Sequence, residues 1–220
     1  MNMYEQPIGQ LACALPGATR IFHQHKLDFC CGGHKSLREA AEKRGLNLDA
    51  LLSELEPLQK LDSQNRDWRS ASPAELIDYI LRRFHEQHRQ DVPELIRLAR
   101  RVEQVHADRS DCPAGLADHL EIMFQELLSH MMKEERVLFP MIKQGAGRGA
   151  AMPIQMMMHE HTEHEAALAE LRALTDDFTP PEGACGSWQR LYALAKELSD
   201  DLNDHIALEN NILFARVLAS

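Results

Sequence analysis

Apolar residues between positions 72 and 220 recur every three or four residues along four separate segments, with charged and polar residues between them. This spacing places the apolar side chains of each segment on one face of an α-helix. The pattern therefore predicts an all-α protein that contains a four-helix bundle. The four stripes are Ile77, Leu81, His85, His88, Val92, Leu95, Ala99 and Val102; Leu116, Leu120, Met123, Leu127, His130, Glu134, Val137 and Met141; Ile154, Met157, His161, His164, Leu168 and Leu171; and Leu191, Leu194, Leu198, Leu202, His205, Glu209 and Ile212.

The boundaries of the four segments carry recognisable signals. Ser72-Pro73-Ala74-Glu75 supplies an N-cap serine, a proline for the first helical position and a capping-box glutamate, so a long helix is predicted to begin there. Helix-breaking stretches at 108–113, 145–149 and 179–186 separate the helices, and such short connections favour an up-down-up-down order. We also expect a kink or a helix end near Pro93 and near Pro140.

The residues before this bundle form a second compositional unit. Short helical runs at 37–43 and 48–58 surround the turn Cys30-Cys31-Gly32-Gly33, and the polar stretch 61–71 is typical of a linker. We therefore predict a small helical N-terminal domain at 1–62 and a helix bundle at 72–220.

Two similar motifs bring candidate metal ligands onto the stripes. The first motif, at 130–139, is His-Met-Met-Lys-Glu-Glu-Arg-Val-Leu-Phe and contains His130 and Glu134. The second, at 205–214, is His-Ile-Ala-Leu-Glu-Asn-Asn-Ile-Leu-Phe and contains His205 and Glu209. Residues four apart share one helix face, so each motif presents an imidazole beside a carboxylate. This is an internal repeat of metal-binding residue types on core-facing positions.

A second repeat, His-x-x-His, adds His85 with His88 and His161 with His164. The midpoints in sequence between successive candidate histidines of the four helices fall in or beside the three loops, which places one histidine of each helix at about the same height. His88 and His164 lie nearly a turn farther along. They could cap the site, relay protons or only complete the core.

Six residues are therefore predicted to bind metal: His85, His130, Glu134, His161, His205 and Glu209. Six exceeds the three protein ligands of a catalytic zinc, so two ions fit better. Imidazoles and carboxylates without thiolates suit iron or manganese, and we favour iron. Glu126 and Asp201, each four residues before a motif histidine, either accept a hydrogen bond from a ligand imidazole or remain solvated.

Composition narrows the function classes. With 34 acidic against 24 basic residues and no basic stripe, nucleic acid is not an expected partner. No signal peptide or membrane-spanning apolar run is apparent, and the odd number of cysteines does not fit a secreted disulfide framework, so we expect a cytoplasmic protein. The vicinal thiols of Cys30 and Cys31 could pass electrons, bind metal transiently or carry a nitrosyl adduct, or they could be small turn residues.

The turn Asp28-Phe29-Cys30-Cys31-Gly32-Gly33 and the two His-x-x-x-Glu motifs resemble the repair-of-iron-centres proteins, also called the ScdA or YtfE family, over essentially the whole chain. The resemblance implies a ScdA-type N-terminal domain joined to a hemerythrin-like four-helix bundle that holds two non-haem iron ions with oxo and carboxylate bridges. It also implies that Glu134 and Glu209 are the bridging carboxylates. Glu126 and Glu160 match family carboxylates near the metal or its access path.

Two departures from oxygen-carrying hemerythrins bear on activity. Position 165 is Glu165 where those proteins carry a third-helix histidine, and the last motif ends in Glu209 where they carry an aspartate. One histidine fewer leaves the coordination more open, which argues against simple reversible oxygen storage and favours reactive or exchangeable iron.

The resemblance implies a protein that repairs iron-sulfur clusters damaged by nitric oxide or oxidants. Its iron would bind or reduce NO, be donated to damaged iron-sulfur client proteins, or both, with Cys30, Cys31, Glu126 and Glu160 as the residues that take part in the chemistry. One alternative is an enzyme that reduces NO to nitrous oxide at a non-haem di-iron centre. Another is a hemerythrin-like sensor or store for O2 or NO. The sequence leaves a monomer and a homodimer equally open.

Overall fold

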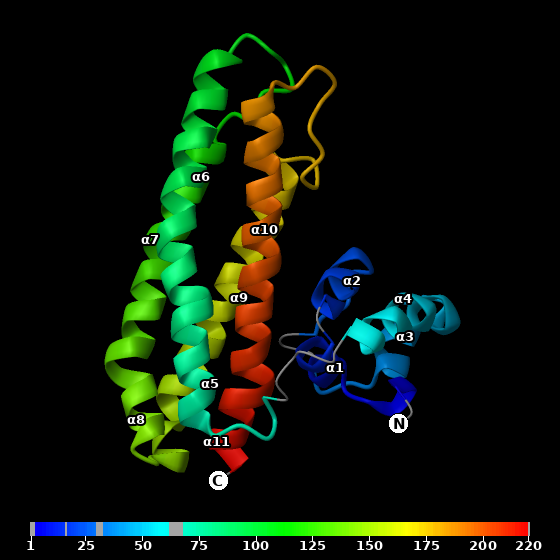
Figure 1. Ribbon diagram of the computed structural model, residues 1–220, viewed down its shortest axis with the longest axis vertical. Helices are drawn as coiled ribbons and strands as arrows, with labels where there is room; N and C mark the ends of the chain where they lie inside the picture. The colour runs from blue at the N-terminus through cyan, green and yellow to red at the C-terminus, as the bar shows by residue number, and fades with distance from the viewer. Residues whose placement is uncertain (1–2, 16, 30–32, 62–67, 220) are drawn as a thin grey trace. The chain divides into compact units, whose positions relative to one another are not determined.

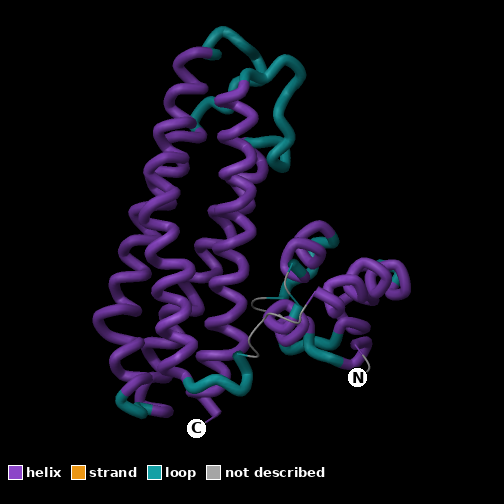
Figure 2. Tube along the Cα trace, in the orientation of Figure 1, coloured by secondary structure: helices purple, strands orange, loops and turns teal. Residues whose placement is uncertain are grey.

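The computed structural model describes residues 3–15, 17–29, 33–61 and 68–219. Within these residues every regular element is a helix, and none forms a β-strand (Figure 2). The predicted all-α class is therefore confirmed. The chain separates into two compact units, one of Met1–Asp78, Met141–Ile154 and Asn203–Ser220 and the other of Tyr79–Pro140 and Gln155–Leu202.

The second unit contains most of a four-helix bundle. Its helices alternate in direction and are joined by loops at their ends (Figure 1). The predicted stripes line their inner faces, and His85, His88, His130, His161 and His164 are all buried there with the apolar residues. The long helices are α6 (Glu86–Val105), α7 (Leu116–Lys133), α9 (Ala151–Leu174) and α10 (Gly186–Leu208), and α5 (Pro73–Ile80) leads into α6.

In the described part of the chain, three π-helical segments interrupt the α-helices. They are η3 (Leu81–His85), η4 (Glu134–Leu138) and η6 (Glu209–Phe214). Each segment starts or ends at a predicted metal ligand, namely His85, Glu134 or Glu209. Single π-turns in α-helices occur often at functional sites because the wider turn changes which side chains face inward.

The π-turn of η4 corrects one sequence prediction. Val137, assigned to the second stripe, is 51% exposed, whereas its neighbour Leu138 is only 1% exposed. The prediction assumed an uninterrupted α-helix, but the wider turn beginning at Glu134 inserts an extra residue and shifts the buried face by one position.

The helical path continues through both prolines, so neither marks a helix end, and the predicted kinks stay predictions. Pro93 lies inside α6, which continues to Val105. Its ring is on the exposed side of the helix, where water can hydrate the carbonyl that loses its amide partner. Pro140 lies in α8 (Phe139–Lys143), directly after η4, so the helical path also continues there.

The first unit contains a small helical N-terminal part. It comprises η1 (Met3–Glu5), α1 (Ile8–Ala14), α2 (Ala18–Gln24), α3 (Leu37–Arg44) and α4 (Leu48–Leu61). The same unit holds η5 (Gly147–Ala150) and α11 (Ala215–Ala219). The helices at 37–43 and 48–58 were predicted with slightly shorter bounds.

The start of α5 follows its sequence signal. The Ser72 hydroxyl accepts a hydrogen bond from the Glu75 amide at 3.2 Å, and the Glu75 carboxylate accepts one from the Ser72 amide at 2.9 Å. These reciprocal bonds form the predicted capping box, which satisfies two amides that the first helical turn leaves unpaired.

Candidate metal centre

Glu134 lies between two buried histidines of the second unit. Its Oε2 atom is 3.4 Å from Nε2 of His85 and 3.4 Å from Nε2 of His130. All three side chains are at most 2% exposed. One carboxylate oxygen therefore faces two imidazole nitrogens inside the bundle.

A carboxylate next to Nδ1 of each ring determines the orientation and the tautomer of these two histidines. Nδ1 of His85 lies 2.7 Å from Oε1 of Glu135, and Nδ1 of His130 lies 2.9 Å from Oε2 of Glu160. An ionised carboxylate only accepts hydrogen bonds, so each ring donates from Nδ1, and in the neutral imidazole this leaves the Nε2 lone pair facing Glu134. This is the arrangement that orients histidine for metal binding.

Both orienting carboxylates also have a cationic partner. Arg89 donates to Glu135 at 2.7 Å, and Lys133 donates to Glu160 at 2.5 Å. Burial alone would raise the pKa of Glu135, but the hydrogen bonds from His85 and Arg89 outweigh it and lower that pKa below the ordinary glutamate value. Glu135 is therefore ionised at neutral pH and available as an acceptor.

His161 and His164 of α9 both contact His130. Nε2 of His161 is 3.1 Å from Nε2 of His130, so two imidazole nitrogens converge. The ring of His164 stands nearly perpendicular to that of His130, with 5.0 Å between the ring centroids. His164 thus lies against a candidate ligand.

The first unit holds the repeat-related pair on the last helix. Nε2 of His205 is 3.2 Å from Oε1 of Glu209, and both side chains are buried. The His-x-x-x-Glu spacing therefore produces the side-by-side imidazole and carboxylate that the sequence predicts.

The buried donors fall into two groups whose ligand atoms lie within 4.8 Å of one another. One group is His85, Glu134, His205 and Glu209, and the other is His130, Glu134, His161 and Glu209. Each group has two histidines of its own, while both glutamates belong to both groups. A cluster of this composition can hold a metal ion, and its imidazole and carboxylate donors suit iron.

The other predicted site residues have different surroundings. Glu126 is on α7 and exposed, whereas Glu160 contacts His130. Asp201 pairs with Arg83 at 2.7 Å instead of a ligand histidine. Cys30 and Cys31 lie outside the described residues.

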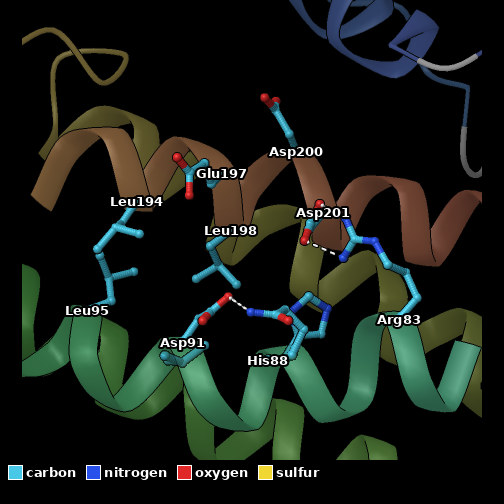
Figure 3. A pocket seen from close by; sticks show the side chains of 11 residues that line it. Arg83, His88, Asp91, Leu95, Leu194, Glu197, Leu198, Asp200 and Asp201 are labelled. Carbon is cyan, nitrogen blue, oxygen red and sulfur yellow. Dashed lines mark hydrogen bonds and ion pairs between the residues drawn. The ribbon is translucent and has the colours of Figure 1, made fainter. Parts of the chain in front are cut away.

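His88 lines a pocket of about 500 Å³ between α6 and α10 (Figure 3). The Arg83–Asp201 ion pair lies at this pocket, and Asp91, Glu197 and Asp200 complete its acidic lining. The ring of His88 stacks on that of Phe84 at 6.2 Å. His88 therefore lines a polar pocket one helical turn from His85, and its predicted roles in capping the site, relaying protons or completing the core stay predictions.

Sequence reasoning missed Glu135. It sits one residue after a predicted ligand and off the apolar stripe, so the periodicity did not single it out. The signal was the pair Arg89 and Glu135: a basic residue four positions after His85 can hold a carboxylate beside that histidine.

Comparison with known proteins agrees with this geometry. Residues 76–217 match the hemerythrin HHE cation binding domain, and residues 4–59 match ScdA_N, a domain of unknown function (DUF542). The chain is 50% identical over 218 residues to the iron-sulfur cluster repair protein YtfE of Pectobacterium atrosepticum and 49% identical over 218 residues to that of Edwardsiella ictaluri. It is 49% identical over 220 residues to a probable iron-sulfur cluster repair protein of Haemophilus influenzae.

Each alignment covers 99% of this chain and 99% of the relative. The chain therefore belongs to the family of the iron-sulfur cluster repair proteins named YtfE, as the sequence resemblance indicated. Among the described residues, no helix combines the length and apolar character needed to cross a membrane.

Proposed function

We propose that His85, His130, Glu134, His161, His205 and Glu209 bind two non-haem iron ions, as the oxo- and carboxylate-bridged centre that the resemblance implies. The observation that carries this proposal is the division of the buried donors into two groups with Glu134 and Glu209 in common. Paired-metal sites in helix bundles use inward carboxylates in this way.

Burial supports the same proposal. Two carboxylates and four imidazoles at most 2% exposed would carry a desolvation cost of several kcal/mol per uncompensated charge. A cation among them offsets that cost. Iron bound there supplies an exchangeable, redox-active ion with affinity for NO or O2.

We further propose that the protein repairs iron-sulfur clusters damaged by nitrosative or oxidative stress. Its relatives carry that activity in their names. The expected partners are NO or O2 as small ligands and damaged iron-sulfur proteins as clients, in the cytoplasm, with neither nucleic acid nor membrane involved. Cys30 and Cys31 would pass electrons, and Glu126 would lie on the access path.

The same proposal includes two domains, at 1–62 and 72–220, in which the N-terminal domain carries the cysteines that would pass electrons and the bundle carries the metal ligands. Residues 4–59 and 76–217 match two separate family domains, which supports it.

The decisive experiment is anaerobic purification followed by metal analysis and transfer assays. About two irons per chain, followed by movement of that iron to an apo-protein that needs a [4Fe–4S] cluster, is the expected result. Catalytic formation of nitrous oxide from NO without iron transfer would assign the reductase activity instead. Reversible NO binding with neither outcome would assign a sensor, and a single zinc with no spectral response to NO would remove the di-iron centre.

A further inference from the structure

Asn211 of η6 reaches out of its own helix into the N-terminal part of the first unit. Its Nδ2 atom donates to the carbonyl of Phe29 at 3.2 Å and to the carbonyl of Ala207 at 3.0 Å. Asn211 therefore joins the main chain after α2 to the helix that carries Glu209, two residues away.

Two glycines make room for this carboxamide. A Cβ atom on Gly9 would lie 2.0 Å from Oδ1 of Asn211, and one on Gly33 would lie 2.3 Å from the same oxygen. The Gly9 amide also donates to the Gly33 carbonyl at 2.9 Å, which holds the two glycines together. Any larger residue at either position would collide with Asn211. We call Gly9, Gly33 and the Phe29 carbonyl the Asn211 socket.

Two more contacts from the N-terminal helices reach the same stretch of the last helix. The buried Thr19 hydroxyl donates to Asp204 at 2.6 Å, and the Cys13 thiol donates to the Ala207 carbonyl at 3.3 Å. Positions 204, 207 and 211 alternate with His205 and Glu209 along the chain. Contacts with the N-terminal part of the unit therefore hold this segment at positions before and after both His205 and Glu209.

External support matters here because η6 is π-helical. A π-turn departs from the regular hydrogen-bonding pattern of the α-helix and is rare in proteins. The Ala207 carbonyl, one turn before Asn211, accepts both the Asn211 amide and the Cys13 thiol. Side chains thereby add hydrogen bonds at the junction where α10 gives way to η6.

We propose that Asn211 is a positioning residue: its insertion into the socket fixes the π-turn and so holds the Glu209 carboxylate in its metal-binding position. This inference rests on the proposed role of Glu209 as a ligand. It gives the N-terminal domain a direct effect on metal retention, in addition to any chemistry of its own.

The first test compares Asn211→Ala and Asn211→Asp with wild type. Both variants remove the donated hydrogen bonds, and Asp keeps the side-chain shape. After anaerobic loading with Fe²⁺, loss of iron to an excess of ferrous chelator should be about tenfold faster in both variants, as expected for residues that support metal ligands. In the metal-free proteins, amide hydrogen exchange at residues 203–214 should also become faster.

Arg216→Ala is the matched control. Arg216 lies in α11, which directly follows η6, and donates to the carbonyl of Ala71 at 2.6 Å, but it is about two turns beyond Glu209. Its loss should leave iron release and exchange at 203–209 unchanged. Unchanged iron release and unchanged exchange in the Asn211 variants, or equal effects in Arg216→Ala, would overturn the proposal.

The second test approaches the socket from its other side and does not require metal. Gly9→Ala alone should increase hydrogen exchange at 203–214 because its Cβ displaces Asn211. In an Asn211→Ala background the same substitution should have no such effect, since the colliding atoms are gone. Additive effects would refute the socket. If wild type holds no iron, the proposed function fails, while this cycle still decides whether Asn211 positions the segment.

Discussion

Glu160 and His130 lie on different helices of the bundle and form a partly buried pair in which the carboxylate fixes the ring. The 2.9 Å contact from Nδ1 of His130 leaves Nε2 directed at Glu134 and His161. The carboxylate that the family resemblance placed near the metal therefore has a defined structural task, which is to select the tautomer of a candidate ligand.

Removing that carboxylate should weaken metal binding. Glu160→Ala deletes the acceptor of His130 Nδ1 and the partner of Lys133, so we expect about tenfold to a hundredfold lower metal affinity, measured by competition with a chelator of known affinity. Glu163→Ala, on an exposed glutamate of the same helix, is the control and should bind metal normally. Equal affinities in both variants would show that Glu160 does not orient His130.

Shared and unshared ligands should differ in stoichiometry. Glu134 belongs to both donor groups, whereas His161 belongs to one. Glu134→Ala should therefore lose both ions, while His161→Ala should retain about one ion per chain, as measured by elemental analysis after anaerobic loading. The reverse order of losses would contradict a centre in which the glutamates connect two ions.

Substitution of the vicinal cysteines should separate metal binding from repair. Cys30→Ser together with Cys31→Ser leaves all six proposed ligands in place, so the iron content should persist while transfer of iron or reduction of NO falls. Cys185→Ser, which changes an exposed thiol elsewhere, is the control for general thiol effects. Loss of both irons in the double variant would mean that the thiols help to hold the metal.

Stability should decline at alkaline pH partly because of Cys13. Burial, reinforced by the Asp204 carboxylate, raises the pKa of the Cys13 thiol in the folded protein well above its unfolded value of about 8.5. The folded state thus holds this proton more tightly, so its contribution to stability is complete below about pH 8.5 and is lost as pH rises toward the folded pKa.

The measurement is urea unfolding between pH 7.5 and 10. Cys13→Ala should reduce the decline in unfolding free energy by at most about 1.4 kcal/mol per pH unit, the limit for one proton. Burial also raises the pKa of Cys112, so part of the slope should remain. Identical slopes for wild type and Cys13→Ala would contradict the assignment.

The register of η4 gives a stability test. Leu138→Ala should cost about 2–5 kcal/mol of unfolding free energy because it empties a core position. Val137→Ala, one residue earlier, should stay within about 0.5 kcal/mol because Val137 is exposed. Chemical denaturation of the metal-free variants measures both values, and comparable losses would indicate an ordinary α-helical register.

Periodicity and local motifs were enough to anticipate the long bundle helices, their order and the burial of the six candidate donors, since amphipathic spacing directly determines which side of a helix is buried. The short helices α1 and α2 were not predicted. Val137 was misplaced because the predicted stripe assumed regular α-helical turns, whereas the π-turn of η4 shifts the register by one residue. Glu135 and Asn211 were missed for another reason. Their roles depend on side chains far away in sequence, at Arg89 and His85 for one and at Gly9, Phe29 and Gly33 for the other.

The three π-turns have a consequence for how this protein can change over time. Because each turn accommodates one extra residue, deleting a single residue there would restore an unbroken α-helix and leave the later residues on the faces they occupy now. In η4, with Arg136 removed, Leu138 would stand three residues after Glu134, the α-helical spacing that keeps both side chains on one face. The packing beyond the turn would therefore survive such a deletion, whereas the wide turn that carries the ligand would be lost.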